Sequence, residues 1–508
     1  MPKRALAKIF AMALVAGILT SCSSKPVTPN PPKGSLITIV QDAPICDAIS
    51  ASITIQGLSL TPVFGGANVG YIAETASFAP LIRLNLQQLR DFSTILYVFS
   101  VPEGTYNEAN FNFELVQVAM YEPTLNPPLK MLSASLTQAK PIIALNPPLV
   151  ITAGQANVML LDFDVLRMLQ VDSTGQPTGK VTPVIGLAQL TTTGSTPFYE
   201  FDDLWGFVRS VTTTTSPTNP TFTGSFLMQL LGTSASGAPA VTVNMTADTN
   251  TVGFIDLPHL VTDSYVEVNA TLDSQGNVVA NTVEFQAVED PYPTNPSVTP
   301  STAFIGPIVS ITTDQAGNLT QFDMWVRDAE PYDPSAITLD SIFEVNLLSS
   351  NPTYQVSALG PNFANLAFGP TNLALGQEVV VHGAYTKPPG LSGSVPPLLT
   401  TIAPTAIFLR LQSLQGTLGS IVQIGSDGVT GAFVLIPCGT LLQGAPIYVL
   451  TNNQTTFLNA TGLGGLTAAD SLLVRGMPFF EPQATTINGV SIPAGTLVVQ
   501  AKGVHVLQ

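Results

Sequence analysis

Histidine is the side chain best suited to move protons or bind metals near neutral pH, and this chain has three: His259, His382 and His505. His259 follows a proline in a predicted loop, and the other two lie beside valines in predicted strands. The sequence has no HExxH motif, no histidine pair and no Cys-His cluster, so it does not indicate a zinc site. We interpret all three as structural histidines.

Motifs for nucleophilic catalysis and phosphate binding are also missing from the sequence. Residues 390–394 (GLSGS) lack the final glycine of a GxSxG nucleophile elbow and lie in a Pro-rich insertion. No Gly-rich loop followed by Lys and Ser or Thr is present. We therefore predict a non-catalytic protein without metal or cofactor. The 33 acidic residues still offer many carboxylate pairs, which leaves glycoside hydrolysis open as an alternative.

Two carboxylates and two tryptophans are candidates for contact with a ligand. Asp162 and Asp164 lie two apart in a predicted strand and would share one face, where they could contribute oxygens to calcium. No Asp- or Asn-rich loop accompanies them, which favours a solvated face. Trp205 and Trp325 are the chain's two tryptophans. Core packing is the default interpretation, and a sugar-binding platform is the alternative.

Cys22 closes the run Leu19-Thr20-Ser21-Cys22, after a basic N-terminus and an apolar segment of residues 9–19. That segment is shorter than the roughly 20 residues that span a bilayer. This order resembles the signal peptide and lipobox of bacterial lipoproteins. The resemblance implies cleavage before Cys22 and lipid attachment to its sulfur. Ser23 at the next position implies the outer membrane, on its periplasmic or surface face.

The other two cysteines, Cys46 and Cys438, fall in different predicted domains and match no metal-ligand spacing. We interpret both as buried thiols, and a long-range disulfide formed in an oxidising compartment is the alternative.

The composition indicates an extracytoplasmic β protein with many turns. Charged residues make up 10% of the chain, against about 25% in an average domain. With 40 glycines and 42 prolines, long helices are disfavoured. The net charge of −16 would repel a phosphate backbone, so nucleic acid is not an expected partner.

The N-terminal third contains short segments with strand periodicity. Residues 52–56 alternate polar and apolar side chains, and apolar residues recur with period two over 111–115. Strands this short and frequent favour a β-sandwich. Residues 81–92 are the one plausible short helix, although their alternating start is also compatible with a strand.

Three short motifs in this region resemble a bacterial family known only as a domain of unknown function and common at the N-terminus of lipoproteins. The motifs are Asp42-Ala43-Pro44, the PEGTY segment at 102–106 and the LDFD segment at 161–164. The resemblance implies a Greek-key β-sandwich over about residues 35–170. It implies no activity, so no catalytic residue is carried over from it.

The remainder of the chain repeats a plan. A Gly-led strand opens each unit: GFVRSV at 206–211, GPIVSI at 306–311 and GTLGSI at 416–421. A polar residue leading a Val- or Leu-rich strand follows later in each unit. Units of this length should each own a core. They resemble small β-barrel repeats of bacterial exported proteins, which are also domains of unknown function.

The predicted fold class is mainly β, with a Greek-key sandwich followed by about three small barrel-like modules. The predicted segments are a signal peptide (1–21), a Pro-rich tether (22–34), the sandwich (35–170), a linker (171–203), module 1 (204–288), a Pro-rich linker (289–301), module 2 (302–411) and module 3 (414–508).

Three functions fit this sequence. The first is a lipid-anchored envelope protein that works as a non-catalytic binding or structural surface, with an envelope polysaccharide or protein as its partner. The second is an envelope hydrolase acting on polysaccharide or peptide. The third is an accessory of envelope transport or assembly. Missing catalytic motifs favour the first.

Overall fold

The computed structural model describes residues 31–42, 48–72, 82–86, 93–132, 134–173, 177–213, 221–230, 240–289, 299–330, 337–357, 367–387, 399–439, 441–442, 445–468 and 470–507. It is 65% strand and 4% helix, which confirms the predicted mainly-β fold class. Among the described residues, no helix combines the length and the apolar character needed to cross a membrane. Cys22, Cys46 and the signal-peptide residues lie outside the described residues.

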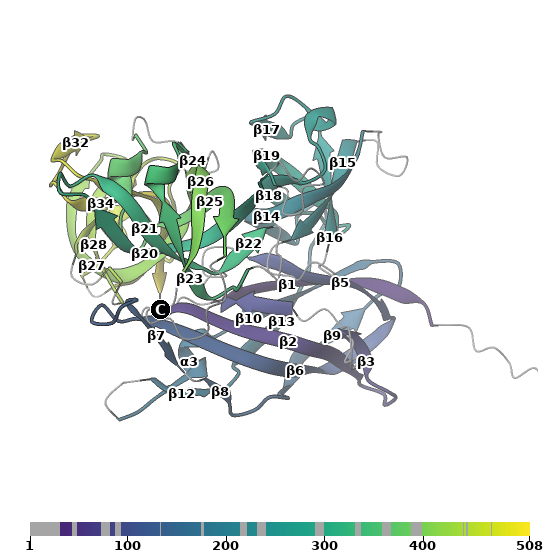
Figure 1. The fold of residues 1–508 in the computed structure, drawn as a ribbon. Coiled ribbons are helices and arrows are strands. Elements are labelled where there is room, and N and C mark those ends of the chain that lie inside the picture. Colours follow the sequence, from purple (N-terminus) through teal and green to yellow (C-terminus); the bar gives the residue numbers. More distant parts are fainter. Residues whose placement is uncertain are drawn as a thin grey trace, which may run out of the picture.

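Two sheets packed face to face form the N-terminal sandwich, at the bottom of Figure 1. The first has the order β13-β10-β1-β5, and the second has the order β3-β2-β6-β7 with β4 on β2 and β9 on β6. Their bounds are β1 Lys33–Asp42, β2 Ala48–Pro62, β3 Val69–Ile72, β4 Ile82–Asn85, β5 Thr94–Pro102, β6 Gly104–Tyr121, β7 Leu129–Leu132, β9 Ile142–Ile151, β10 Ala156–Phe163 and β13 Ile185–Leu190. The predicted period-two residues Phe111 and Phe113 both point into the core.

The structure places strands in residues 171–203, which the sequence analysis assigned to a linker. After the short helix α3 (Val165–Met168), β11 (Leu169–Val171) and β12 (Pro177–Val181) form a small sheet with the earlier strand β8 (Ser135–Leu136). β13 then returns to the sandwich and pairs with β10. β11 and β12 are only three and five residues long, and β12 (PTGKV) has the composition of a turn, so the local sequence carries little strand signal here. For residues 81–92 the sequence is compatible with a helix or, at its start, a strand. Residues 82–85 form strand β4.

Three modules follow the sandwich, each with a five-stranded path and one to three short extra strands. In module 1 the strands are β14 Tyr199–Thr212, β15 Phe222–Leu230, β16 Ala240–Thr246, β17 Asn250–Val252, β18 Ser264–Leu272 and β19 Val278–Val288. Module 2 has β20 Thr302–Thr313, β21 Leu319–Val326, β22 Asp328–Glu330, β23 Ser341–Asn346, β24 Thr353–Val356, β25 Glu378–Thr386 and β26 Thr400–Leu409. Module 3 has β27 Gln412–Ile424, β28 Gly431–Pro437, β29 Ile447–Thr451, β30 Thr456–Leu458, β31 Ser471–Glu481, β32 Thr485–Ile487, β33 Val490–Ile492 and β34 Thr496–Leu507. Short 3₁₀ turns occupy Leu257–His259, Leu347–Ser349, Pro370–Asn372 and Leu463–Gly465.

The three modules share one topology. In each, the first main strand pairs antiparallel with the second and fourth, the third pairs with the second, and the fifth pairs with the fourth. A parallel pairing of the third and fifth strands (β16–β19, β23–β26 and β29–β34) then joins the two ends of the path. This closed order, 1-2-3-5-4, is that of the OB-fold, a five-stranded Greek-key barrel. We call the modules barrels 1, 2 and 3.

The Gly-led opening strands have a steric cause. Gly206, Gly306 and Gly416 hold equivalent places in the first strand of each barrel, where the second strand crosses very close to the backbone. A Cβ atom on these glycines would overlap the carbonyl oxygens of Gln229, Trp325 and Ile436. Any larger residue would force the two strands apart, so the repeat motif visible in the sequence marks the tightest point of each barrel.

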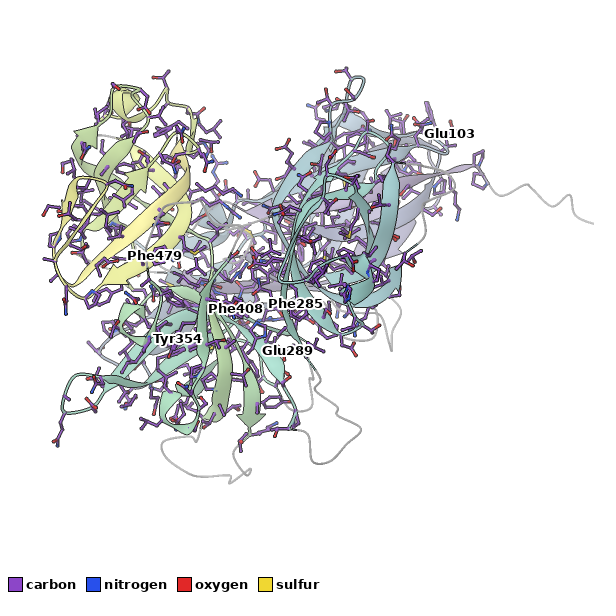
Figure 2. The ribbon with its side chains drawn as sticks, turned by 90° about the horizontal axis from the view of Figure 1, so that it is seen from above. Glu103, Phe285, Glu289, Tyr354, Phe408 and Phe479 are labelled. Carbon is purple, nitrogen blue, oxygen red and sulfur yellow. The ribbon has the colours of Figure 1, made fainter. Side chains whose placement is uncertain are left out.

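The four domains are fused through shared hydrophobic clusters (Figures 1 and 2). Ile37 and Ile95 of the sandwich belong to the cluster that forms the core of barrel 1. Phe207 of barrel 1 packs in one cluster with Phe408 of barrel 2, and Phe479 of barrel 3 packs in the core of barrel 2. Further clusters place Ile49 of the sandwich against Trp325 of barrel 2. The described parts of the four domains therefore pack against one another.

Candidate functional site

Both candidate tryptophans are buried at domain contacts. Trp205 in β14 is 2% exposed and packs beneath Arg410, whose guanidinium carbon lies 4.2 Å from the ring centroid. Trp325 in β21 is also 2% exposed and packs between the sandwich and barrel 2. An indole without a free face cannot stack on a sugar, so both residues join domains in this structure.

The two candidate aspartates do not form a pair on one strand face. Strand β10 ends at Phe163, and Asp164 begins the turn into α3, where its carboxylate accepts from the backbone N–H of Arg167 at 3.1 Å and its other oxygen lies 3.3 Å from the Arg167 side chain. Asp162 is exposed on β10. Within the described residues, no group of three or more His, Cys, Asp or Glu side chains has an arrangement that could hold a metal ion.

The histidines also lie apart from one another. His259 is exposed in the 3₁₀ turn Leu257–His259 and pairs with Asp256. His505 on β34 contacts Asn459, and burial lowers the pKa of its imidazole. His382 on β25 is 2% exposed, pairs with Glu289 and packs edge-on against Tyr265 and Phe408. Figure 2 shows Glu289 and Phe408 where barrels 1 and 2 meet. This pair fastens the segment after barrel 1 to barrel 2.

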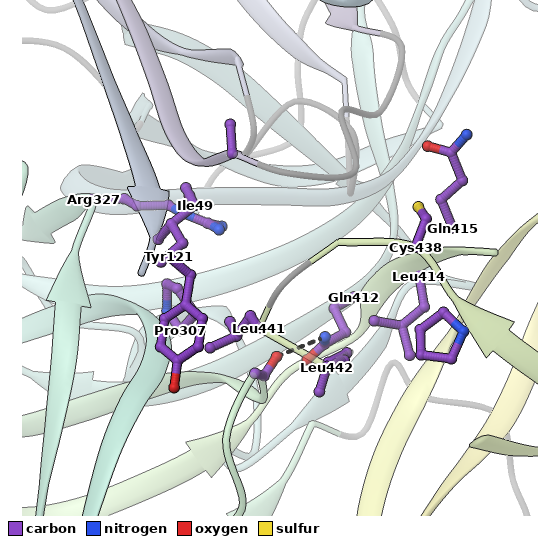
Figure 3. Close-up of a pocket in the computed structure, with 13 residues that line it drawn as sticks. Ile49, Tyr121, Pro307, Arg327, Gln412, Leu414, Gln415, Cys438, Leu441 and Leu442 are labelled. Atoms are coloured by element: carbon purple, nitrogen blue, oxygen red, sulfur yellow. Dashed lines mark hydrogen bonds between the residues drawn. The ribbon is translucent and has the colours of Figure 1, made fainter. Parts of the chain in front are cut away.

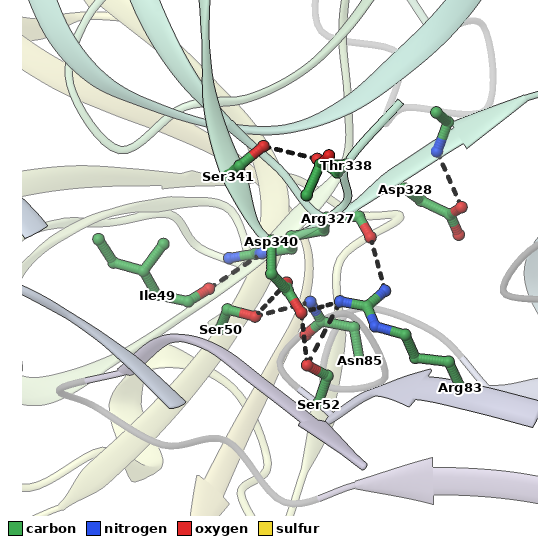
Figure 4. Close-up of polar contacts among 11 residues, drawn as sticks. Ile49, Ser50, Ser52, Arg83, Asn85, Arg327, Asp328, Thr338, Asp340 and Ser341 are labelled. Atoms are coloured by element: carbon green, nitrogen blue, oxygen red, sulfur yellow. Dashed lines mark hydrogen bonds and ion pairs between the residues drawn. The ribbon is translucent and has the colours of Figure 1, made fainter. Parts of the chain in front are cut away.

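A buried polar cluster joins the sandwich to barrel 2 (Figure 4). Asp340, just before β23, forms an ion pair with Arg83 of β4. Its two carboxylate oxygens also accept from the hydroxyls of Ser50, at 2.8 Å, and Ser52, at 2.5 Å. The Asp340 side chain is 1% exposed, so its charge is fully compensated by sandwich residues. The cluster fixes the orientation of the two domains.

Arg327 and Glu378 extend this contact. Arg327, 2% exposed, donates to the backbone carbonyl of Ile49 at 3.0 Å and to the Glu378 carboxylate at 2.9 Å. Arg327 also lines a cavity of about 50 Å³ at the junction of the sandwich with barrels 2 and 3 (Figure 3). Gln412 donates to the Gly376 carbonyl at its edge, 3.0 Å away. A cavity of this size holds a few water molecules and no substrate.

The contact between barrels 1 and 2 is rich in buried acids. Ser357 donates to Glu267 at 3.1 Å and is 3.2 Å from a Glu284 oxygen. Glu330 lies at the same contact. Burial, and then the nearby Asp328 carboxylate, raise the pKa of Glu330 well above its ordinary range, while Arg209 opposes them. Burial likewise raises the pKa of Tyr265, whose ring lies 5.5 Å from that of Trp205. These groups serve an internal contact.

A cleft of about 1000 Å³ that is open to a ligand lies between the sandwich and barrel 1. Its sandwich wall is formed by β1, β5 and the turn before β10, and its barrel wall by β15, β16 and the β18–β19 turn. In Figure 1 it lies where β16 faces β1 and β5. The two walls are held in place because Ile37 and Ile95 contribute to the barrel 1 core.

The cleft has a neutral lining of amide, hydroxyl and apolar groups. None of its described lining residues is Asp, Glu, Lys, Arg or His. Gln155, Thr242 and Gln275 are exposed to it, and Ile37, Ile95 and Val241 supply buried apolar floor. Such a surface can bind by hydrogen bonds and contact, but these residues offer no general acid or base.

The sandwich can be placed in a family. Residues 33–183 match the family model for DUF4382, a domain of unknown function. The DUF4382 domain therefore extends beyond the predicted end at residue 170 and includes the small β8-β11-β12 sheet. Searches of curated proteins and of solved structures gave no significant match.

Cys438 follows the last residue of β28 and is disulfide-bonded. The chain has two other cysteines, Cys22 and Cys46, and both lie outside the described residues. Ala48 and Cys438 line the same cavity between the DUF4382 domain and barrel 3. The buried-thiol interpretation is therefore wrong for Cys438, whose disulfide partner lies outside the described residues.

Sequence reasoning missed the cleft and its polar residues. Gln155 and Gln275 occupy ordinary turns, and the Asp273–Asn277 segment reads as a solvent-exposed hairpin. No local signal distinguishes it from the Asp314–Asn318 turn in barrel 2, because the difference lies in what each turn faces.

Proposed function

We propose that this protein is a lipid-anchored, non-catalytic binding and structural module of a bacterial cell envelope, held at the outer membrane through Cys22. The observation that carries the binding role is the cleft between the DUF4382 domain and barrel 1. It is large enough for a ligand, at the upper end of the about 300–1,000 Å³ that such sites occupy, and its described lining is free of ionisable side chains.

The buried charges support the same proposal. Asp340, Arg327 and Glu378 are 1–2% exposed side chains that join domains to one another. An envelope hydrolase would keep carboxylates with perturbed pKa values in an open cleft, where substrate could reach them. Here Glu330, whose carboxyl pKa is strongly raised, is buried in a domain contact.

The lipobox and the disulfide support the envelope location independently. Small residues directly precede Cys22 after a basic and then an apolar segment. Disulfides such as that of Cys438 persist in oxidising compartments outside the cytoplasm. The net charge of −16 disfavours a nucleic-acid partner, so an envelope polysaccharide or protein is the proposed partner.

Fractionation of the native host tests the anchor. The wild-type chain is expected in the outer-membrane fraction and the Cys22→Ala variant in the soluble fraction. Cys438→Ser, which also removes a cysteine but leaves Cys22 in place, serves as the control and is expected to stay with the membrane. A Cys22→Ala variant that remained membrane-bound would contradict the lipid anchor.

Two other functions are alternatives for this protein. An envelope hydrolase requires turnover of polysaccharide or peptide that is lost on a single acidic substitution. An accessory of transport or assembly requires a partner protein that crosslinks to this chain in the envelope. Incubation with purified envelope polymers, followed by mass spectrometry of the products, separates the binding role from the first alternative.

A further inference from the structure

We propose that the cleft between the DUF4382 domain and barrel 1 binds a neutral oligosaccharide or polysaccharide segment. This inference rests on the proposed function, since it names the ligand of a binding protein. It starts from the lining, where exposed amide and hydroxyl groups stand beside a buried apolar floor.

Charge excludes the ionic ligands. No described lining residue is charged, so the cleft offers no partner for a phosphate, a carboxylate or an ammonium group. The acidic chain as a whole also repels polyanions. The ligand that fits is uncharged.

Hydrogen-bonding capacity excludes a purely apolar ligand. Gln155 and Gln275 each carry a carbonyl oxygen and an NH₂ group, and Thr242 carries a hydroxyl. All three are exposed, so they can turn toward a ligand. Sugar hydroxyls both donate and accept, which matches amide side chains that do the same.

The apolar floor matches the other face of a sugar ring. Val98 of β5 is 41% exposed and lines the cleft, beside the buried Ile37 and Ile95. The C–H faces of a pyranose can bury against such a surface, while its equatorial hydroxyls reach the amides at the rim.

Strand pairing excludes strand addition by a peptide at β1. β1 is hydrogen-bonded on both sides, to β10 and to β5. Peptides that bind in a groove by strand addition require a free edge. The wall formed by β1 offers side chains only, and the edge strand on this side of the sheet is β5.

The β18–β19 turn makes the cleft rigid. The Asp273 carboxylate accepts from the backbone N–H groups of Gln275, at 2.9 Å, and Asn277, at 2.8 Å. Gly276 of this turn packs on Ala156 and Ile37 of the DUF4382 domain. Gln275 is therefore presented from a fixed backbone, which lowers the entropy lost when a ligand binds.

Calorimetry on the full chain in detergent tests the proposal. The neutral probes are hexasaccharides of α-glucose, β-glucose, mannose and N-acetylglucosamine, and the charged probes are oligogalacturonate and the glucosamine hexamer. At least one neutral probe is expected to bind, and the charged probes are not. Gln275→Ala should weaken binding about five- to tenfold through loss of hydrogen bonds, and Thr242→Trp should weaken it further by placing a bulky ring in the cleft.

Two matched variants serve as controls. Gln315→Ala changes an exposed glutamine in the equivalent turn of barrel 2, and Thr417→Trp changes an exposed strand threonine in barrel 3. Both are expected to bind like the wild type.

The proposal is overturned if no neutral hexasaccharide binds, if a charged probe binds as tightly, or if both cleft variants bind like the wild type. Cleavage of a bound probe, seen by mass spectrometry of the titrated sample, would instead overturn the non-catalytic function and leave the ligand class standing.

Discussion

Gly276 lies against Ala156, and this contact seats the β18–β19 turn of barrel 1 on the DUF4382 domain. A Cβ atom on Gly276 would overlap that of Ala156 and approach Cδ1 of Ile37 to 3.1 Å. Gly317 occupies the same position in an equivalent turn of barrel 2, with φ of 84° against 82°. There, a Cβ atom would meet no described atom within 4 Å.

Comparing substitutions at these two glycines measures how much the domain contact contributes to the free energy of unfolding. Gly317→Ala is expected to cost about 1–2 kcal/mol of unfolding free energy, because alanine is strained at positive φ. Gly276→Ala carries the same strain and adds the overlap with Ala156, so it should cost clearly more. Urea unfolding of the two variants measures the difference. Equal costs would mean that the turn does not hold the domains together.

The Asp340–Arg83 ion pair makes a second prediction about the assembly. Asp340→Asn leaves Arg83 without its carboxylate in a largely buried cluster, and we expect a loss of about 2–3 kcal/mol in unfolding free energy. Asparagine tolerates the positive φ of 53° at this position, so the backbone is not the cause. Thermal unfolding followed by circular dichroism gives the measurement.

The control for that variant is an exposed ion pair of the same domain. The Arg167 side chain is 76% exposed where it meets Asp164, and Arg167→Ala should change the unfolding free energy by less than about 1 kcal/mol. If both variants cost the same, the buried cluster would be no more than a surface contact.

Several features of the fold could be predicted from local sequence. The alternation around Phe111 and Phe113 identified a strand with a buried face, and the Gly-led motifs at Gly206, Gly306 and Gly416 marked the first strand of each barrel. These signals work because the strand period and close backbone approach act on neighbouring residues.

The domain contacts could not be predicted in this way. Asp340 and Glu330 look like surface acids, since their burial depends on partners that lie far away in sequence or on another barrel. The sequence is compatible with Trp205 as a core residue or as a ligand platform. The residue that covers its ring is Arg410, which lies more than two hundred positions later in the chain. The cleft follows from the same long-range packing.

Glu330 predicts how stability depends on pH. Burial first, and then Asp328, raise its pKa well above the ordinary value of 4.5. Below that value the carboxyl is protonated in both the folded and unfolded chain, so its full contribution to stability is present. As the pH rises, the unfolded chain releases this proton first, and the unfolding free energy falls until the folded carboxyl also titrates.

Glu330→Gln should therefore flatten the decline of melting temperature above about pH 5 and stabilise the protein at neutral pH. Asp470 is expected to change stability with pH in the opposite direction. Hydrogen bonds from the backbone N–H and hydroxyl of Thr467 lower its pKa, so Asp470→Asn should remove stability at neutral pH and none below the folded pKa. Melting curves from pH 4 to 8 distinguish the two, and parallel profiles for wild type and Glu330→Gln would refute the assignment.

The disulfide of Cys438 connects the lipid anchor to the fold. If Cys22 carries lipid on its sulfur, it cannot pair, and Cys46 is then the one remaining partner in this three-cysteine chain. Its near neighbour Ala48 lines the same cavity as Cys438. Peptide mapping of the native protein without reductant is expected to yield a linked pair containing Cys46 and Cys438, together with a lipidated N-terminal peptide. A linked pair containing Cys22 would refute both the pairing and the anchor.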